Sequence, residues 1–116
     1  MCTGVLLLLL TPLFAQDPGG GPPAPKNLKL LKPENVMPAM KSFTVALGVK
    51  CDFCHVKGDF ASDENHHKEV ARHMIELSRE INAKFPDGKR HVTCYTCHRG
   101  AEEPATAPPG EASAGK

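Results

Sequence analysis

Apolar residues recur at helical spacing in two stretches of this chain, and the first stretch covers residues 33–48. One of its faces is apolar at every third or fourth position: Val36, Met40, Phe43 and Leu47. Asn35 has the side chain of a helix N-cap, Pro38 fits only in a first turn, and Gly48 favours a helix end. The pattern predicts a helix that ends just before the first pair of cysteines.

The second apolar stripe follows a turn at residues 58–59 and predicts a longer helix. Its apolar positions again fall three or four apart: Val70, Met74, Leu77, Ile81 and Phe85. Ser62 or Asp63 is expected to cap this helix, which should reach about Phe85 and stop before residues 86–88. No stretch alternates apolar and polar residues for long enough to predict a strand, so the expected fold class is all-α.

The two ends of the chain are expected to lie outside the folded domain. Residues 1–16 have the apolar run of a secretory signal peptide, with cleavage expected after Ala15. Residues 17–26 are expected to form a Pro/Gly-rich linker and residues 101–116 a disordered tail, because neither contains a large apolar residue to bury. Residues 27–100 remain as one folded domain of a periplasmic protein, with no transmembrane span in its mature form.

Aromatic bulk is scarce for a domain of this size. The 116-residue chain has no Trp, one Tyr and five Phe, and a domain below about 80 residues rarely stabilises itself by an apolar core alone. A bound cofactor with a large apolar surface would supply what the side chains do not. The formal charge of +1 and the lack of a basic stripe argue against nucleic acid as a partner.

Two CxxCH motifs contain the residues suited to binding such a cofactor: Cys51, Cys54 and His55 in the first, and Cys94, Cys97 and His98 in the second. Two thiols at this spacing form thioether bonds to both vinyl groups of one haem, and the adjacent histidine then ligates the iron. The sequence therefore predicts two covalently bound haem c groups, with His55 and His98 as iron ligands. Cys2, the remaining cysteine, belongs to the expected signal peptide.

Three other uses of a CxxC pair compete with this interpretation. A zinc ribbon usually separates its two pairs by about 15–20 residues, whereas 39 residues lie between Cys54 and Cys94. A thioredoxin-type redox pair belongs to a βαβ pattern that this sequence lacks, and a disulfide within each pair is compatible with an exported protein. None of the three requires a histidine directly after both pairs, which favours haem.

Each haem iron has a sixth position, for which the mature chain offers three methionines: Met37, Met40 and Met74. A methionine on an apolar face usually fills the core, but two irons need ligands here and few methionines exist. Met74 is expected to bind the second haem. Met40 shares a face with Phe43 and Leu47 and is expected to bind the first, while Met37, one turn away, stays an alternative. The histidines outside the motifs are weaker candidates: His66, His67, His73 and His91.

Two segments of the chain resemble one protein family. MKSFTVALGVKCDFCHV, and KEVARHMIELSREINAKF followed by HVTCYTCHRG, are similar to the cytochrome c subunit of photosynthetic reaction centres. They resemble even more the diheme relatives of that subunit from non-photosynthetic bacteria. The resemblance covers about residues 28–100, and it is more specific than the CxxCH motifs alone.

The resemblance has consequences for the ligands and for the partners. The reaction-centre subunit arranges four haems as two similar diheme halves, with a methionine supplied from a helix ahead of the motif in three cases, and this chain resembles one half. By position, the resemblance implies Met40 as a ligand beside His55, and Met74 as a ligand beside His98. Leu77 stands where some relatives have a second methionine. Because only one half is matched, neither docking to a reaction centre nor photosynthesis follows.

These expectations combine into a small diheme c-type cytochrome with two helix–CxxCH units in a pseudo-two-fold arrangement and extensive loops. Ligation by histidine and methionine closes both irons to substrate, so the expected function is one-electron relay between periplasmic redox partners, without catalysis. The donor and acceptor stay open, as do docking to a membrane complex and stacking into assemblies. A diheme peroxidase or a haem-based sensor is the alternative if one iron lacks its methionine, and a zinc module is the alternative if no haem binds.

Overall fold

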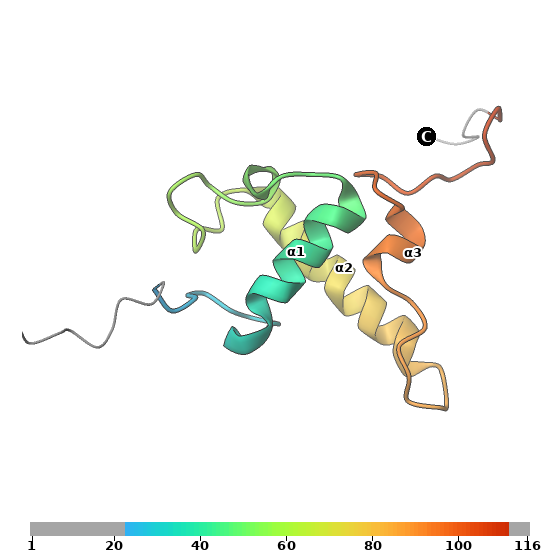
Figure 1. The fold of residues 1–116 in the computed structure, drawn as a ribbon, viewed down its shortest axis with the longest axis horizontal. Helices are drawn as coiled ribbons and strands as arrows, with labels where there is room; N and C mark the ends of the chain where they lie inside the picture. Colours follow the sequence, from blue (N-terminus) through green and yellow to red (C-terminus); the bar gives the residue numbers. More distant parts are fainter. Residues whose placement is uncertain (1–22, 112–116) are drawn as a thin grey trace, which may run out of the picture.

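The structure, a computed structural model, describes residues 23–111, and its regular elements are all helical (Figure 1). In chain order they are η1 (Pro33–Asn35), α1 (Val36–Leu47), η2 (Cys51–Phe53), α2 (His66–Ala83) and α3 (Cys94–His98), where η denotes a 3-10 turn. Within residues 23–111, the only extended pairing is an isolated bridge between Val56 and Asp59. The expected all-α class is confirmed. The expected signal peptide, Cys2 and parts of the expected linker and tail lie outside the described residues.

Helix α1 forms where the apolar periodicity predicts it. The turn η1 leads into Val36, and Asn35 stands at the N-cap position without a side-chain capping bond. Gly48 ends the helix in the left-handed region, at a φ of 68°, and its N–H donates to the carbonyl of Thr44. A residue with a Cβ is strained at this φ, so a glycine allows α1 to stop directly before the first CxxCH motif.

Helix α2 begins later than expected, and the predicted caps, Ser62 and Asp63, are wrong. Asn65 caps the helix, because its side-chain oxygen accepts a hydrogen bond from the N–H of His67 at 3.1 Å. The hydroxyl of Ser62 instead accepts a bond within its own turn. The carboxylate of Asp63 is bound by basic side chains, of which Arg72 lies nearest at 2.8 Å. Contacts with side chains further along the chain therefore decide which of several capping residues is used.

The other end of α2 also differs from the prediction. The α-helix ends at Ala83, and the N–H of Phe85 donates to the carbonyl of Asn82 at 3.2 Å, which is the tighter spacing of a 3-10 turn. Phe85 stacks on His91, with ring centroids 4.1 Å apart. Nε2 of His91 donates to Asp87 at 2.9 Å, and this bond is the main cause that lowers the pKa of Asp87. Side-chain contacts thus close the turn that leads from α2 to the second motif.

Helix α1 packs against α3, and part of the contact is between backbone atoms (Figure 1). The N–H of Gly100, just after α3, donates to the carbonyl of Ala46 at 2.8 Å. A Cβ added at Gly48 would collide with the carbonyl oxygen of Gly100. The missing side chain at Gly48 therefore lets the end of α1 lie directly against the exit of the second motif.

Few apolar side chains are buried in this fold. Within residues 23–111, Ala46 is the only buried hydrophobic residue. Several large apolar side chains on or just after α2 are exposed: Val70, Met74, Leu77, Ile81 and Phe85. These are the residues of the predicted stripe, so α2 presents an apolar face that the described protein leaves accessible. In the same part of the chain, no helix combines the length and apolarity needed to cross a membrane.

Gly48→Ala is expected to destabilise the protein more than Gly88→Ala. The two residues have nearly the same positive φ, 68° and 67°, so both substitutions carry the left-handed penalty of about 1–2 kcal/mol. Only at Gly48 does the added methyl group meet another backbone segment, since Gly88 has nothing within 4 Å. Free energies of unfolding from denaturant titration should therefore differ by at least about 1 kcal/mol. Equal losses in the two variants would contradict the close contact between Gly48 and Gly100.

Candidate functional site

The first CxxCH motif forms a tight turn directly after α1. The N–H groups of Cys54 and His55 both donate to the carbonyl of Cys51, at 3.3 and 3.0 Å, which gathers the two thiols and the imidazole on one short segment. Cys51 is exposed, whereas Cys54 is half-buried, and burial raises the pKa of the Cys54 thiol. Burial therefore favours the neutral thiol form of Cys54, the less reactive form of a cysteine.

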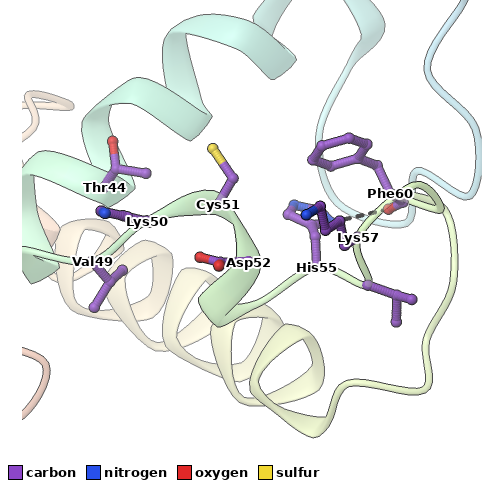
Figure 2. Close-up of a pocket in the computed structure, with 9 residues that line it drawn as sticks. Thr44, Val49, Lys50, Cys51, Asp52, His55, Lys57 and Phe60 are labelled. Carbon is purple, nitrogen blue, oxygen red and sulfur yellow. Dashed lines mark hydrogen bonds between the residues drawn. The ribbon is translucent and has the colours of Figure 1, made fainter.

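An open cavity of about 560 Å³ lies beside this turn. Its wall comes from the end of α1, from η2 and from the loop that follows: Thr44, Val49, Lys50, Cys51, Asp52, His55, Val56, Lys57 and Phe60. Figure 2 shows Cys51 between Thr44 and His55, with Phe60 on the far side of the imidazole ring. The volume lies in the range of ligand pockets, about 300–1,000 Å³. A thiol and the imidazole of the motif thus border one accessible space.

The imidazole of His55 is oriented by the loop after it. Nδ1 lies 3.0 Å from the carbonyl oxygen of Phe60, the bond drawn as a dashed line in Figure 2. A carbonyl oxygen only accepts, so Nδ1 carries the proton, and in the neutral ring Nε2 is the nitrogen with the lone pair. Histidines that ligate a metal through Nε2 are oriented by this kind of bond at Nδ1.

In the second motif the imidazole is oriented in the same way, although the backbone of this motif is α-helical. It forms α3, which begins with a capping box in which Thr93 and Thr96 exchange side-chain and backbone bonds. Arg99, at a φ of 52°, and the glycine after it turn the chain back. The carbonyl of Ala101 then accepts from Nδ1 of His98 at 3.1 Å. His98 is only 9% exposed, and its Nε2 again keeps the lone pair.

Each motif therefore offers two thiols and one nitrogen suited to a metal. In the part of the chain that the structure describes, all four cysteines are free. Among those same residues, no group of three or more His, Cys, Asp or Glu side chains is arranged to hold a metal ion. Free thiols beside an imidazole with an available Nε2, together with an accessible apolar helix face, fit haem c.

Comparison with known proteins points to the same chemistry. Residues 26–109 match the family model of the photosynthetic reaction centre cytochrome c subunit. The chain belongs to this family. Membership implies covalently bound haem c and a role in electron transfer.

Three curated relatives show how much of the chain is shared. The photosynthetic reaction center cytochrome c subunit of Thermochromatium tepidum is 48% identical over 62 residues, which are 49% of this chain and 15% of the relative. Cytochrome c-554 of Chloroflexus aurantiacus is 46% identical over 61 residues, 48% of this chain and 15% of the relative. The subunit of Roseobacter denitrificans is 37% identical over 94 residues, 69% of this chain and 25% of the relative. The chain thus spans a quarter or less of the length of each.

The methionines of this chain that are candidate iron ligands lie on α1 and α2. Met40 is half-buried, one turn before Thr44, which lines the cavity of the first motif. Residues four apart share a helix face, so Met40 lies on the face that leads to the cavity. Met37 lies on that face one turn further away and is 65% exposed, while Met74 is 37% exposed in the middle of the α2 stripe.

The histidines outside the motifs make other contacts. The ring of His67 packs in tilted arrangements against Phe53 and His66, with ring centroids 4.2 and 4.0 Å away. His73 is exposed between two carboxylates of α2, at 3.8 and 3.7 Å. The Nε2 atom of His91 is bound to a carboxylate at 2.9 Å, which occupies the nitrogen that an axial ligand would use.

Two side chains at the start of α2, which the sequence analysis did not single out, hold the first motif and its loop. Nδ2 of Asn65 donates to the carbonyl of Phe53, inside η2, at 3.0 Å. Nζ of Lys68 donates to three consecutive loop carbonyls at 3.0, 2.9 and 2.7 Å: those of Phe60, Ala61 and Ser62. The helical pattern marks Lys68 only as polar, because periodicity says nothing about where loop carbonyls point.

Asn82 holds the second motif from the other end of α2. Its Oδ1 accepts from the N–H groups of His91 and Val92 at 2.7 and 2.9 Å. Its Nδ2 donates to the carbonyl of Val92 at 2.8 Å. Because Val92 stands just before the N-cap of α3, these bonds fix the approach to the second motif. Helix α2 is thus bound to one CxxCH segment at each end.

Asp63 lies at the centre of a cationic cluster near the start of α2. Its carboxylate is 2.8 Å from Arg72, 3.2 Å from Lys68 and 3.2 Å from Lys29. The hydrogen bond from Arg72 is the main cause that holds the pKa of Asp63 well below its usual range. Lys29 belongs to the segment before α1, so the cluster ties that segment to α2.

Asp63→Asn is expected to remove an acid-sensitive part of the stability. A carboxylate whose pKa is lowered by folding stabilises the protein above its unfolded pKa, about 3.9, and this contribution is lost as the pH falls. The unfolding midpoint of the unmodified protein should therefore fall between about pH 5 and pH 2 more steeply than that of the variant, which starts lower at pH 7. Glu80→Gln, which removes an α2 carboxylate outside the cluster, is the control. Parallel pH profiles for the unmodified protein and Asp63→Asn would contradict the prediction.

Proposed function

We propose that this chain is an electron-transfer protein that binds two haem c groups, one at each CxxCH motif, and passes electrons singly between redox partners. At each site the two cysteines would form the thioether bonds and the histidine would ligate the iron through Nε2: Cys51, Cys54 and His55 at the first, Cys94, Cys97 and His98 at the second. The pseudo-two-fold relation of the two units stays a prediction.

The matched imidazoles of His55 and His98 support this proposal most directly. Each Nδ1 is bound to a backbone carbonyl, at 3.0 and 3.1 Å, although the two motifs differ in backbone and in exit loop. A redox-active CxxC pair or a disulfide has no need for a histidine ring oriented in this way. A haem iron does, because the bond at Nδ1 sets the tautomer and the direction of its ligand.

Met40 and Met74 are proposed as the sixth ligands. Haem c supplies a one-electron ferric/ferrous couple, and a methionine ligand raises its reduction potential. If a histidine and a methionine of the protein held each haem iron, no residue would have to act as acid or base on a substrate. The accessible apolar stripe of α2, which includes Met74, offers the surface that a large flat apolar cofactor needs.

The proposed location is the periplasm. Residues 1–16 would be a signal peptide removed on export, residues 17–26 a linker and residues 27–100 the haem-binding domain. Residues 101–116 would be a C-terminal tail whose first residue, Ala101, still accepts the hydrogen bond from His98. Periplasmic redox proteins or a membrane complex are the proposed partners. Because the chain matches a quarter or less of the length of the relatives named above, these partners are given by class only.

The visible absorption spectrum of the mature protein, with haem quantified per chain, tests this proposal. Two haems per chain are expected, together with a far-red band from methionine-ligated ferric iron at the strength of two sites. Cys97→Ala should weaken or abolish attachment at the second site alone, and Cys54→Ala at the first alone. Colourless protein from a host competent in cytochrome c maturation would contradict the proposal. Full carbon monoxide binding by the untreated reduced protein would favour a peroxidase or a sensor instead.

Met40→Ala is expected to halve the far-red band, because one of the two irons loses its thioether ligand. Met37→Ala is the matched control, since it removes a methionine from the same face of α1 one turn away. The band should keep its full strength in that variant. A band halved by Met37→Ala and unchanged by Met40→Ala would reverse the assignment.

A further inference from the structure

The carbonyl oxygen of Phe60 accepts two hydrogen bonds. One comes from Nδ1 of His55 at 3.0 Å and the other from Nζ of Lys68 at 3.0 Å. The side chain of Lys68 is only 13% exposed, so its ammonium group is largely removed from water and held against the loop. A cation therefore shares the oxygen atom that orients the proposed axial histidine.

The corresponding oxygen at the second motif is not shared in this way. The carbonyl of Ala101 accepts from Nδ1 of His98 at 3.1 Å. Within residues 23–111, no lysine, arginine or amide side chain donates to that oxygen. Two motifs with the same pattern of cysteines and histidine thus differ in the acceptor that each imidazole meets.

A shared acceptor changes the electronic character of the imidazole. Bonds from charged donors are stronger than bonds between neutral groups, so the ammonium of Lys68 withdraws electron density from the Phe60 oxygen. The bond from Nδ1–H of His55 weakens as a result, and Nε2 becomes less basic, because bonding at Nδ1 raises ligand basicity. A less basic ligand stabilises ferric iron less, which raises the reduction potential.

We propose that Lys68 is a positioning residue that raises the reduction potential of the haem at His55 by sharing the Phe60 carbonyl with that histidine. The inference rests on the proposed function, because it takes His55 as an iron ligand. It assigns Lys68 an effect on the first haem and none on the second.

Other charges near Lys68 have to be separated from this effect. Lys68 lies 3.2 Å from Asp63, which also binds Arg72 and Lys29. Glu69 is the further carboxylate of the cluster and accepts from Arg72 at 2.9 Å. Lys29 lies 3.2 Å from Asp63 but donates to none of the loop carbonyls that Lys68 binds. Lys29→Met therefore removes the same charge from the same cluster and leaves the Phe60 carbonyl untouched.

Redox titration of the two-haem protein and its variants tests the proposal, with NMR signals of the His55 and His98 rings assigning each step to a haem. Lys68→Met should lower the equilibrium constant for reduction of the first haem by roughly threefold to tenfold, where tenfold corresponds to 59 mV for one electron. The second haem should not change, and Lys29→Met should leave both unchanged. Lys68→Arg keeps a cationic donor and should recover part of the shift.

The reduced, diamagnetic protein provides a second measurement, the first part of which uses only the unmodified protein. The ¹⁵N shift of Nδ1 should indicate a weaker hydrogen bond at His55 than at His98, and Lys68→Met should move His55 towards His98. Unchanged potentials in Lys68→Met, or an equal fall in Lys29→Met, would overturn the proposal. If Lys68→Met does not mature, equal Nδ1 shifts in the unmodified protein would overturn it as well. Unmodified protein without haem at the first motif would instead refute the proposed function.

Discussion

Ala46 is the only apolar side chain that residues 23–111 bury, so hydrogen bonds at the junctions between segments have to set the positions of the helices. Gly100 bonds to Ala46 where α3 meets α1, and the amides of Asn65 and Asn82 bind the two ends of α2 to the two motifs. Each such bond contributes about 0.5–1.5 kcal/mol, which sums to a modest stability. The apolar face of α2 remains to be covered, and in the proposed holoprotein cofactor attachment completes the core that the side chains lack.

The two motifs meet one chemical requirement in two ways. His55 is oriented by a loop that runs out to Phe60 and is fixed by Lys68. His98 is oriented by a turn of left-handed residues, and Gly100 in that turn bonds to α1. The identical pattern of cysteines and histidine sets the ligand chemistry, whereas the loops set the electrostatic surroundings. The two proposed haems could therefore differ in reduction potential even if each has the same kinds of ligand.

Apolar periodicity was sufficient to predict α1 and α2, because a stripe at helical spacing depends only on nearby residues. The CxxCH pattern likewise predicts thiols and an imidazole on one short segment. The start of α2 was predicted wrongly, since Ser62, Asp63 and Asn65 all have capping side chains and the choice depends on Arg72 binding Asp63. The contact of Gly48 with Gly100 could not be predicted from the sequence either. It joins segments far apart in sequence, and no local pattern records it.

The bonds from Lys68 to the loop do not depend on the protonation of nearby carboxylates. An ammonium group has three protons, and three carbonyl oxygens lie within 3.0 Å of Nζ, so every proton of Lys68 has a backbone acceptor. Asp63, at 3.2 Å, then adds mainly electrostatic attraction. Backbone carbonyls do not titrate, so protonation of Asp63 would weaken the cluster without removing the bond from Lys68 to Phe60. The proposed influence on His55 therefore depends on fixed backbone acceptors of the folded loop, whereas the predicted pH dependence of stability comes from the cationic cluster around Asp63.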